Sequence, residues 1–432
     1  MALLDCRDTQ ISLWQAEGAV HSPGFVLHDS GDYHFGRPAL EQSRLRPRDT
    51  NSRFWWQLST QPLKPALGAA RHTADLVHSH LRAVHSEAGA PDTLTFAVPD
   101  SMPREQLSLL LGVAQACDFR VAGLVSRSVL LASLVLARRG ASGRALHVES
   151  QLNQSTVNEL EIDGDSLRLL RSTPLPACGL LALQERCVGA IASAFVQQTR
   201  FDPRRSASSE QTLYNRLPEI LSSVRERGEA SVDIDGHRCR ITASALEPAS
   251  QRLIDGVRQA VGGGSASILL DPELSLLPGV DELGGEHLAA TALWDAWQTQ
   301  ESQVELGDDD VHLIDRLKLG SAIAAGSAPR AEPEDSPRPA PSDAPASLQP
   351  VTRTGTRGAT HVLLDTRALP LRGSQVVLGK GFELREDGGQ WTLHGKGALI
   401  NGLPATPGHP LALGDTLSLG AAGAGRLIEV VD

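Results

Sequence analysis

The chain begins with "ALLDCRDTQISLW" (residues 2–14), in which a short apolar run ends at an aspartate and a polar cluster precedes an alternating segment. Two such runs on either side of a polar turn predict a β-hairpin. A second stretch of this kind, "ALHVESQLNQSTVNELEID" (residues 145–163), occurs further along the chain. Each hairpin leads on to helical segments, so the sequence predicts two halves that start alike.

Strands and helices alternate after each hairpin, because apolar residues recur either at helical spacing or in short continuous runs. This alternation is typical of an α/β fold. The predicted helices cover residues 68–89, 104–119, 128–140, 179–199, 210–227, 248–261 and 286–297.

A stretch rich in Pro, Ala and Ser interrupts the pattern, and it predicts a flexible linker because it has too few apolar residues to form a core. Short alternating strands punctuated by Gly and Pro follow it and predict a small all-β sandwich. We therefore expect a first lobe over residues 1–140, a second lobe over 141–325, a linker over 326–360 and a β-sandwich over 361–432.

Composition limits the classes of function. The chain has 432 residues and a formal net charge of −11, which argues against a nucleic-acid partner. No apolar run is as long as a membrane helix and no secretion signal starts the chain, so we expect a cytoplasmic protein without a membrane partner. Five cysteines without a Cys-x-x-Cys pair predict no metal site.

Several segments, taken in order, resemble the nucleotide-binding domain of the seventy-kilodalton heat-shock chaperones, which are actin-like ATPases. The resemblance is carried by "GRPALEQSRLRPRDTNSRFWWQL" (residues 36–58), by the strand, Val-Pro and helix of residues 93–126, and by residues 200–224 and 266–283. It implies a bilobal, ribonuclease H-like α/β fold. In that family two hairpins grip the phosphates of ATP through backbone N–H groups, which requires small residues at the hairpin tips.

The two hairpins depart from the family pattern. The first reads Asp-Leu-Gly-Thr-Thr in the family, and the residues that match it here are Asp5, Cys6, Arg7, Asp8 and Thr9. Arg7 replaces the glycine, and Asp8 adds an acidic group where phosphates would bind. The second hairpin matches residues 148–156, which include Glu149 and contain no glycine. The resemblance thus implies hairpins that do not admit a triphosphate with its magnesium.

Other family positions differ in the same direction. The lysine that supports the γ-phosphate aligns with Leu40, and the glutamate before a helix aligns with Arg127. An apolar side chain cannot stabilise a transferring phosphoryl group, and arginine cannot replace a water-ordering carboxylate. The Gly-Gly pair beside the adenosine becomes Asp271-Pro272. We therefore expect no catalytic residue, no bound cofactor and a degenerate nucleotide pocket formed by Asp5, Arg7, Asp8, Thr9, Leu40, Arg127, Glu149 and Asp271.

The C-terminal segment resembles a forkhead-associated domain in its closing half, "INGLPATPGHPLALGDTLSLG" (residues 400–420). Lys380 follows a glycine where that family has Gly-Arg, but the Ser-x-x-His segment that helps to read phosphothreonine is missing. Lys380 and Asn401 are its candidate partner-binding residues. The adjacent Trp55 and Trp56 are two more, because exposed tryptophans often anchor interfaces, although core packing at the base of the first half is the simpler explanation.

The resemblance implies a heat-shock-chaperone-like pseudo-ATPase that acts as a cytoplasmic scaffold or adaptor and binds protein partners. Two alternatives stay open. The chain is a nucleotide-binding, chaperone-like ATPase with altered phosphate contacts, in which Mg·ATP binds and Arg7 contacts phosphate, or it is a phosphopeptide-binding module that acts through its C-terminal domain.

Overall fold

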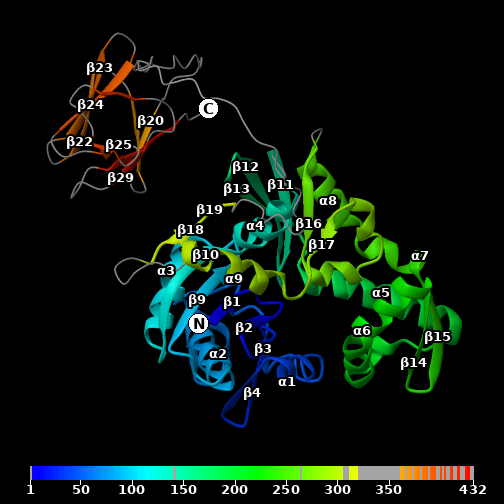
Figure 1. Cartoon of the computed structure of the whole chain (residues 1–432). Helices are drawn as coiled ribbons and strands as arrows, with labels where there is room; N and C mark the ends of the chain where they lie inside the picture. The colour runs from blue at the N-terminus through cyan, green and yellow to red at the C-terminus, as the bar shows by residue number, and fades with distance from the viewer. Residues whose placement is uncertain are drawn as a thin grey trace, which may run out of the picture. The chain divides into compact units, whose positions relative to one another are not determined.

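The computed structural model describes two compact units, Met1–Pro329 and Arg330–Asp432, which are treated separately below (Figure 1). In the first unit, the structure describes residues 2–139, 143–262, 265–304 and 311–319. In the second, it describes residues 361–364, 367–371, 374–379, 382–387, 390–395, 399–400, 403–404, 409–411, 416–418 and 424–428. The predicted linker, residues 326–360, lies outside the described residues.

The first sheet starts with the predicted hairpin, which is confirmed, and continues into a third antiparallel strand. Two later strands then run parallel to the first strand, on its other side. The order is β18-β10-β9-β1-β2-β3. The strands are β1 (Ala2–Asp5), β2 (Ile11–Gln15), β3 (Gly18–Ser22), β9 (Thr93–Val98), β10 (Arg120–Ser126) and β18 (Leu313–Ile314).

The second sheet begins in the same way, with three consecutive antiparallel strands and a later strand that runs parallel to the first of them. Its order is β17-β16-β11-β12-β13-β19. The strands are β11 (Gly143–Ser150), β12 (Ser155–Asp163), β13 (Ser166–Leu175), β16 (Ser267–Leu270), β17 (Glu286–His287) and β19 (Arg316–Lys318).

Two helices, α4 (Arg127–Arg139) and α9 (Ala292–Val304), join the sheets into one body. Their buried side chains form a single apolar cluster with Leu3 from the first sheet and with Leu160 and Leu269 from the second. Because both sheets pack against the same helices, the carboxyl ends of their parallel strands are held in fixed positions relative to one another.

The helices α2 (Thr73–Glu87) and α3 (Arg104–Gln115) cover one face of the first sheet. Their apolar side chains share one cluster with those of the buried strand β9. The predicted helix over residues 68–89 begins only at Thr73, because Ala70–His72 pairs as strand β8 with β7 (Pro62–Leu67). Small elements precede it: β4 (Val26–Asp29), β5 (Asp32–Phe35), α1 (Arg37–Leu40) and β6 (Thr50–Asn51).

A helical region with its own hairpin follows the second meander. Two long helices, α5 (Leu180–Thr199) and α6 (Ala207–Arg227), pack against the hairpin of β14 (Glu229–Ile234) and β15 (His237–Thr242), as Figure 1 shows. The turn of that hairpin is Asp235-Gly236, where both residues have positive φ. The helices α7 (Ala243–Leu246) and α8 (Gln251–Val261) lead back to the second sheet.

The second unit contains short antiparallel strands in two sheets, ordered β21-β20-β29-β28-β25-β26 and β22-β23-β24-β27. Val362, Leu384 and Leu417, from both sheets, share one apolar cluster. The strands are β20 (His361–Leu364), β21 (Arg367–Pro370), β22 (Gln375–Gly379), β23 (Phe382–Asp387), β24 (Gln390–His394), β25 (Leu399–Ile400), β26 (Leu403–Pro404), β27 (His409–Pro410), β28 (Thr416–Ser418) and β29 (Ala424–Ile428).

The chain is therefore a mixed α/β protein with a small antiparallel β unit at its C-terminal end. Within the described residues, no helix combines the length and the apolar character that crossing a membrane requires.

Candidate functional site

The carboxyl ends of parallel strands from both sheets carry charged residues that meet in the interior. Asp5 is the last residue of β1, and Arg127 directly follows β10 as the first residue of α4. In the second sheet, Glu149 lies near the end of β11 and Asp271 directly follows β16. Sites in α/β proteins form at such strand ends.

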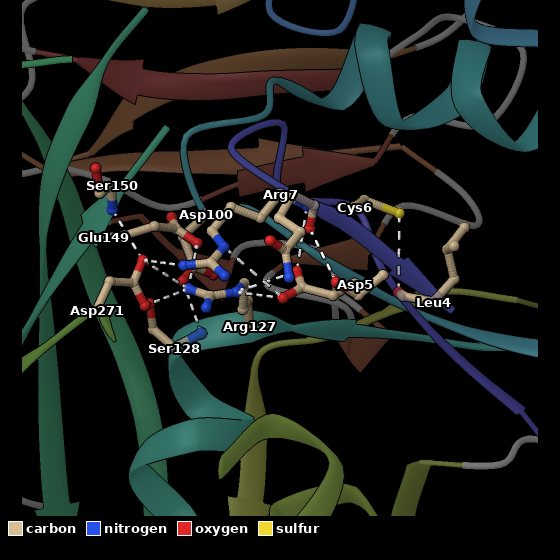
Figure 2. A network of polar contacts seen from close by, with 12 residues as sticks. Leu4, Asp5, Cys6, Arg7, Asp100, Arg127, Ser128, Glu149, Ser150 and Asp271 are labelled. Atoms are coloured by element: carbon tan, nitrogen blue, oxygen red, sulfur yellow. Dashed lines mark hydrogen bonds and ion pairs between the residues drawn. The ribbon is translucent and has the colours of Figure 1, made fainter. Parts of the chain in front are cut away.

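Arg127 lies at the centre of this arrangement, as Figure 2 shows. Its Nε is 3.1 Å from Asp5 Oδ1, and its Nη1 is 3.3 Å from Glu149 Oε1 and 2.9 Å from Asp271 Oδ1. The side chain of Arg127 is only 2% exposed. One guanidinium group therefore joins carboxylates from three strands and both sheets.

Arg7, at the turn of the first hairpin, adds a second guanidinium group to the same network. Its Nη1 is 3.4 Å from Asp271 Oδ2 and also pairs with Glu273, which is partly exposed. Its Nε is 3.8 Å from Asp5 Oδ2. We call Asp5, Arg7, Arg127, Glu149, Asp271 and Glu273 the carboxylate–arginine network.

Further polar groups saturate much of the remaining hydrogen-bonding capacity around Asp271 and Glu149. The Ser150 backbone N–H donates to Asp271 Oδ2 (2.9 Å), and His147 Nε2 is 3.2 Å from Asp271 Oδ1. Asn158 Nδ2 donates to Glu149 Oε2 (3.2 Å). Buried carboxylates require such partners, because an unpaired charge is costly away from water.

The two central acids have opposite pKa shifts. Burial alone would raise the pKa of Asp271, but the Arg127 and Arg7 guanidinium groups outweigh it and hold that pKa well below its usual range. Burial raises the pKa of Glu149 to about 8, although Arg127 opposes this change, and the nearby Asp100 and Asp271 add to it. Asp271 is therefore the principal anion that the arginines compensate.

The tips of the two hairpins contact each other directly. Asp8 Oδ1 accepts a hydrogen bond from the Leu152 backbone N–H at 2.6 Å. Burial raises the pKa of Asp8 to about 7, although this hydrogen bond and Arg7 lower it. We call the bond between Asp8 and Leu152 the hairpin contact, and it joins the start of the first sheet to the start of the second.

Two glycines allow other backbone segments to approach these tips. A Cβ at Gly24 would lie 2.7 Å from the backbone oxygen of Asp8, and a Cβ at Gly179 would lie 2.3 Å from the carbonyl carbon of Asn153. Beyond Gly179, the first amide of α5, from Leu180, donates to Gln151 O at 2.8 Å. The start of α5 thus holds the second hairpin in place.

The structure brings together most of the residues of the predicted pocket. Asp5, Arg7, Asp8, Thr9, Arg127, Glu149 and Asp271 are all buried near the strand ends and hairpin tips. Leu40, in α1, is not part of this network and lines a cavity that Thr9 also lines.

The two tryptophans have different environments. Trp55 is 2% exposed and donates from Nε1 to His80 Nδ1 at 3.0 Å, so it has little surface to offer a partner. Trp56 is 38% exposed and donates to Gln154 Oε1 at 2.9 Å. Lys380 and Asn401 lie outside the described residues.

Sequence reasoning missed His147, Asn158 and Ser128, which support the network. His147 and Asn158 are directly opposite each other on β11 and β12, and Ser128 Oγ lies 2.7 Å from both His147 Nδ1 and Asn158 Nδ2. The sequence carried a signal for such residues, because the polar His147 and Glu149 alternate with apolar residues in β11. The residues of this strand from Ala145 to Ser150 are all buried.

Among the described residues, no group of three or more His, Cys, Asp or Glu side chains could hold a metal ion. Comparison of the sequence with known protein families finds no matching family. Comparison with curated proteins finds no similar chain.

Proposed function

We propose that the chain is an actin-like, heat-shock-chaperone-like pseudo-ATPase that acts as a protein-binding scaffold without nucleotide turnover. The two sheets support the actin-like part of this proposal, because each begins with a three-stranded meander and adds a parallel strand beside the first. Their parallel strands end at one shared site, where that class of protein binds its nucleotide.

The observation that carries the proposal is the position of Arg127. Its guanidinium group joins Asp5, Glu149 and Asp271 at the strand ends, where the resemblance would place a phosphate or its metal. Here Arg127 itself supplies the positive charge that pairs with these carboxylates.

The residues present do not fit a magnesium triphosphate. In the family, backbone N–H groups of the hairpins bind phosphate, but here the Leu152 N–H is bound by the Asp8 carboxyl group. The Asp8 side chain is buried between the hairpin tips, where the family resemblance would place phosphate. Arg7, which lies in the turn of the first hairpin, is already paired with Glu273 and Asp271.

A scaffold function agrees with a body that internal contacts hold in a single arrangement. A heat-shock ATPase changes conformation when its nucleotide is exchanged. Here the hairpins are joined by side chains and backbone groups of the chain itself, which are not exchanged as a nucleotide is. We infer that protein partners bind to a constant surface of the first unit. The C-terminal unit then offers a second surface, whose tether would raise the effective concentration of its partner.

Isothermal titration of the full chain with Mg·ATP tests the proposal. At up to about 1 mM nucleotide, a concentration that saturates any site with a Kd below roughly 100 μM, we expect no saturable heat. Saturable binding that is lost in Arg7→Ala would overturn the proposal and favour an ATPase with altered phosphate contacts. Arg53→Ala is the matched control, because Arg53 is exposed and distant in sequence from both hairpin tips.

A further inference from the structure

A cavity of about 570 Å³ lies beside the hairpin contact in the first unit. Its volume lies within the range of small-ligand and peptide-anchor pockets. One wall comes from the segment between Thr9 and Ser52, and the other comes from Leu152 together with α5 and α6. Neither the carboxylate–arginine network nor the proposed function assigns a role to this cavity.

The floor of the cavity is apolar. Phe25 and Leu152 are buried in one small cluster, against which the partly buried Leu40 and Leu181 pack. These side chains come from both walls, so the floor exists only while the hairpins remain together. A leucine-sized side chain would remove this surface from water at about 25 cal/mol per Å² of buried apolar area.

The charged side chains on the walls are already compensated by neighbours. Arg37 Nε pairs with Glu41 at 2.8 Å. Arg44 lies 3.8 Å from the centre of the Tyr214 ring and within 4.0 Å of Glu185 and Glu210. Partial burial, with a contribution from Arg7, lowers the pKa of His21, which keeps that wall residue neutral at pH 7. A charged ligand would therefore find no free counter-charge in the cavity.

Two neutral amide side chains on the walls, in contrast, lack partners among the described residues. The side-chain amides of Gln10 and Gln184 line the cavity and make no hydrogen bond to any described residue. These groups match the N–H and C=O groups of a peptide backbone.

We propose that the cavity binds an extended, uncharged peptide segment of a partner protein, with one or two leucine-sized side chains on the apolar floor. The amides of Gln10 and Gln184 pair with the peptide backbone, as side-chain amides and peptide groups have matching donors and acceptors. This inference rests on the proposed scaffold function and names the chemistry of the partner.

Fluorescence anisotropy with the full chain tests the proposal. The probe is the labelled peptide Gly-Ser-Leu-Val-Leu-Asn-Gly, compared with versions in which both leucines become serine or in which Ser and Asn become two acids or two lysines. We expect saturable binding of the neutral peptide and at least about tenfold weaker binding of the other three, since tenfold corresponds to the loss of one good apolar or polar contact.

Variants of α5 locate the binding site. Leu181→Glu should weaken binding at least about tenfold, and an acid is tolerated in the first turn of a helix. Gln184→Ala should weaken it several-fold. The matched controls are Leu170→Glu, at an exposed leucine of β13, and Gln197→Ala, at an exposed position of the same helix. Both should leave the affinity within about twofold of the wild type.

Three results would overturn the inference: no saturable binding, tighter binding of a charged peptide, or equal effects of Leu181→Glu and Leu170→Glu. These results differ from a failure of the proposed function. Mg·ATP binding with intact peptide binding contradicts only the pseudo-ATPase, whereas loss of peptide binding in a chain that ignores nucleotide contradicts only the cavity proposal.

Discussion

At position 127, a guanidinium group lies where carboxylates from three strands converge, almost completely shielded from water. Desolvating such charges is expensive, and their attraction offsets the cost only when every partner is present. The resemblance to the heat-shock chaperones aligns their glutamate with this position. Arg127 instead places a cation here, and the neighbouring acids pair with it.

Replacing Arg127 with methionine keeps much of the side-chain volume but leaves Asp5 and Asp271 without their main counter-charge. We expect a loss of about 3–5 kcal/mol in the free energy of unfolding, because buried charges would be uncompensated. Urea unfolding at pH 7 measures this change. Adding Asp271→Asn should recover part of the loss, since one of the stranded charges is then removed.

The control for this experiment is Arg168→Met, which breaks the exposed pair with Glu161. Exposed pairs contribute about 0–1 kcal/mol, so this variant should unfold nearly as the wild type does. Equal stabilities of the two arginine variants would show that Arg127 is not the centre of a buried network.

Asp8 gives the protein a pH-dependent stability. Its pKa rises from 3.8 to about 7 on folding, so the folded state holds a proton that the unfolded state has already lost. The stability that this proton contributes is complete below about pH 4 and is lost as the pH rises through about 7. Glu149, whose pKa is raised to about 8, acts in the same direction up to a higher pH.

Asp8→Asn retains an oxygen that can accept the Leu152 N–H but does not titrate. Between pH 5 and 7 we expect its stability to fall with pH less steeply than that of the wild type, by up to about 1.4 kcal/mol per pH unit. Urea unfolding across this range, with exposed Asp32→Asn as the control, measures the two slopes. Identical slopes for wild type and Asp8→Asn would contradict the assignment.

At the scale of elements, the placement of the second hairpin depends on the start of α5. Gly179→Ala should destabilise the protein, because a Cβ would lie 2.3 Å from the Asn153 carbonyl carbon and backbone cannot easily move aside. We expect a loss of about 1–3 kcal/mol, as for other overpacked sites.

Gly189→Ala in the same helix is the matched control, because its Cβ would meet nothing closer than 4.0 Å. Alanine favours helix interiors over glycine by about 1 kcal/mol, so this variant should be more stable than the wild type. Thermal unfolding compares the two variants. A shift of the midpoint in the same direction for both would contradict the close packing of Gly179 against the hairpin.

The hairpins, the buried parallel strands and most helices were predictable, because periodicity reports which side of an element faces the core. The first residues of helices were harder to predict. Ala70–His72, for example, pairs with a strand that the local pattern does not reveal. The sequence singled out Asp5, Arg127 and Asp271 only through the resemblance to a family pattern. Their mutual contacts were not predictable, because Arg127 and Asp271 are brought together only by the packing of two separate sheets.

In the whole molecule, polar contacts hold the two halves of the first unit together. The carboxylate–arginine network and the hairpin contact both join residues of the first sheet to residues of the second. Every group in these contacts belongs to the chain itself. The same arrangement keeps the two walls of the cavity in place, so a stable body and a stable peptide site have a common cause.

Hydrogen exchange of the Leu152 backbone amide tests this central claim most directly. The amide donates to Asp8 in the absence of any ligand, so its exchange should be at least about 100-fold slower than in an unstructured peptide. Mass spectrometry with fragmentation across residues 150–154 measures it with and without Mg·ATP. The account predicts slow exchange that nucleotide does not change. Fast exchange without nucleotide that becomes slow when Mg·ATP is added would contradict it.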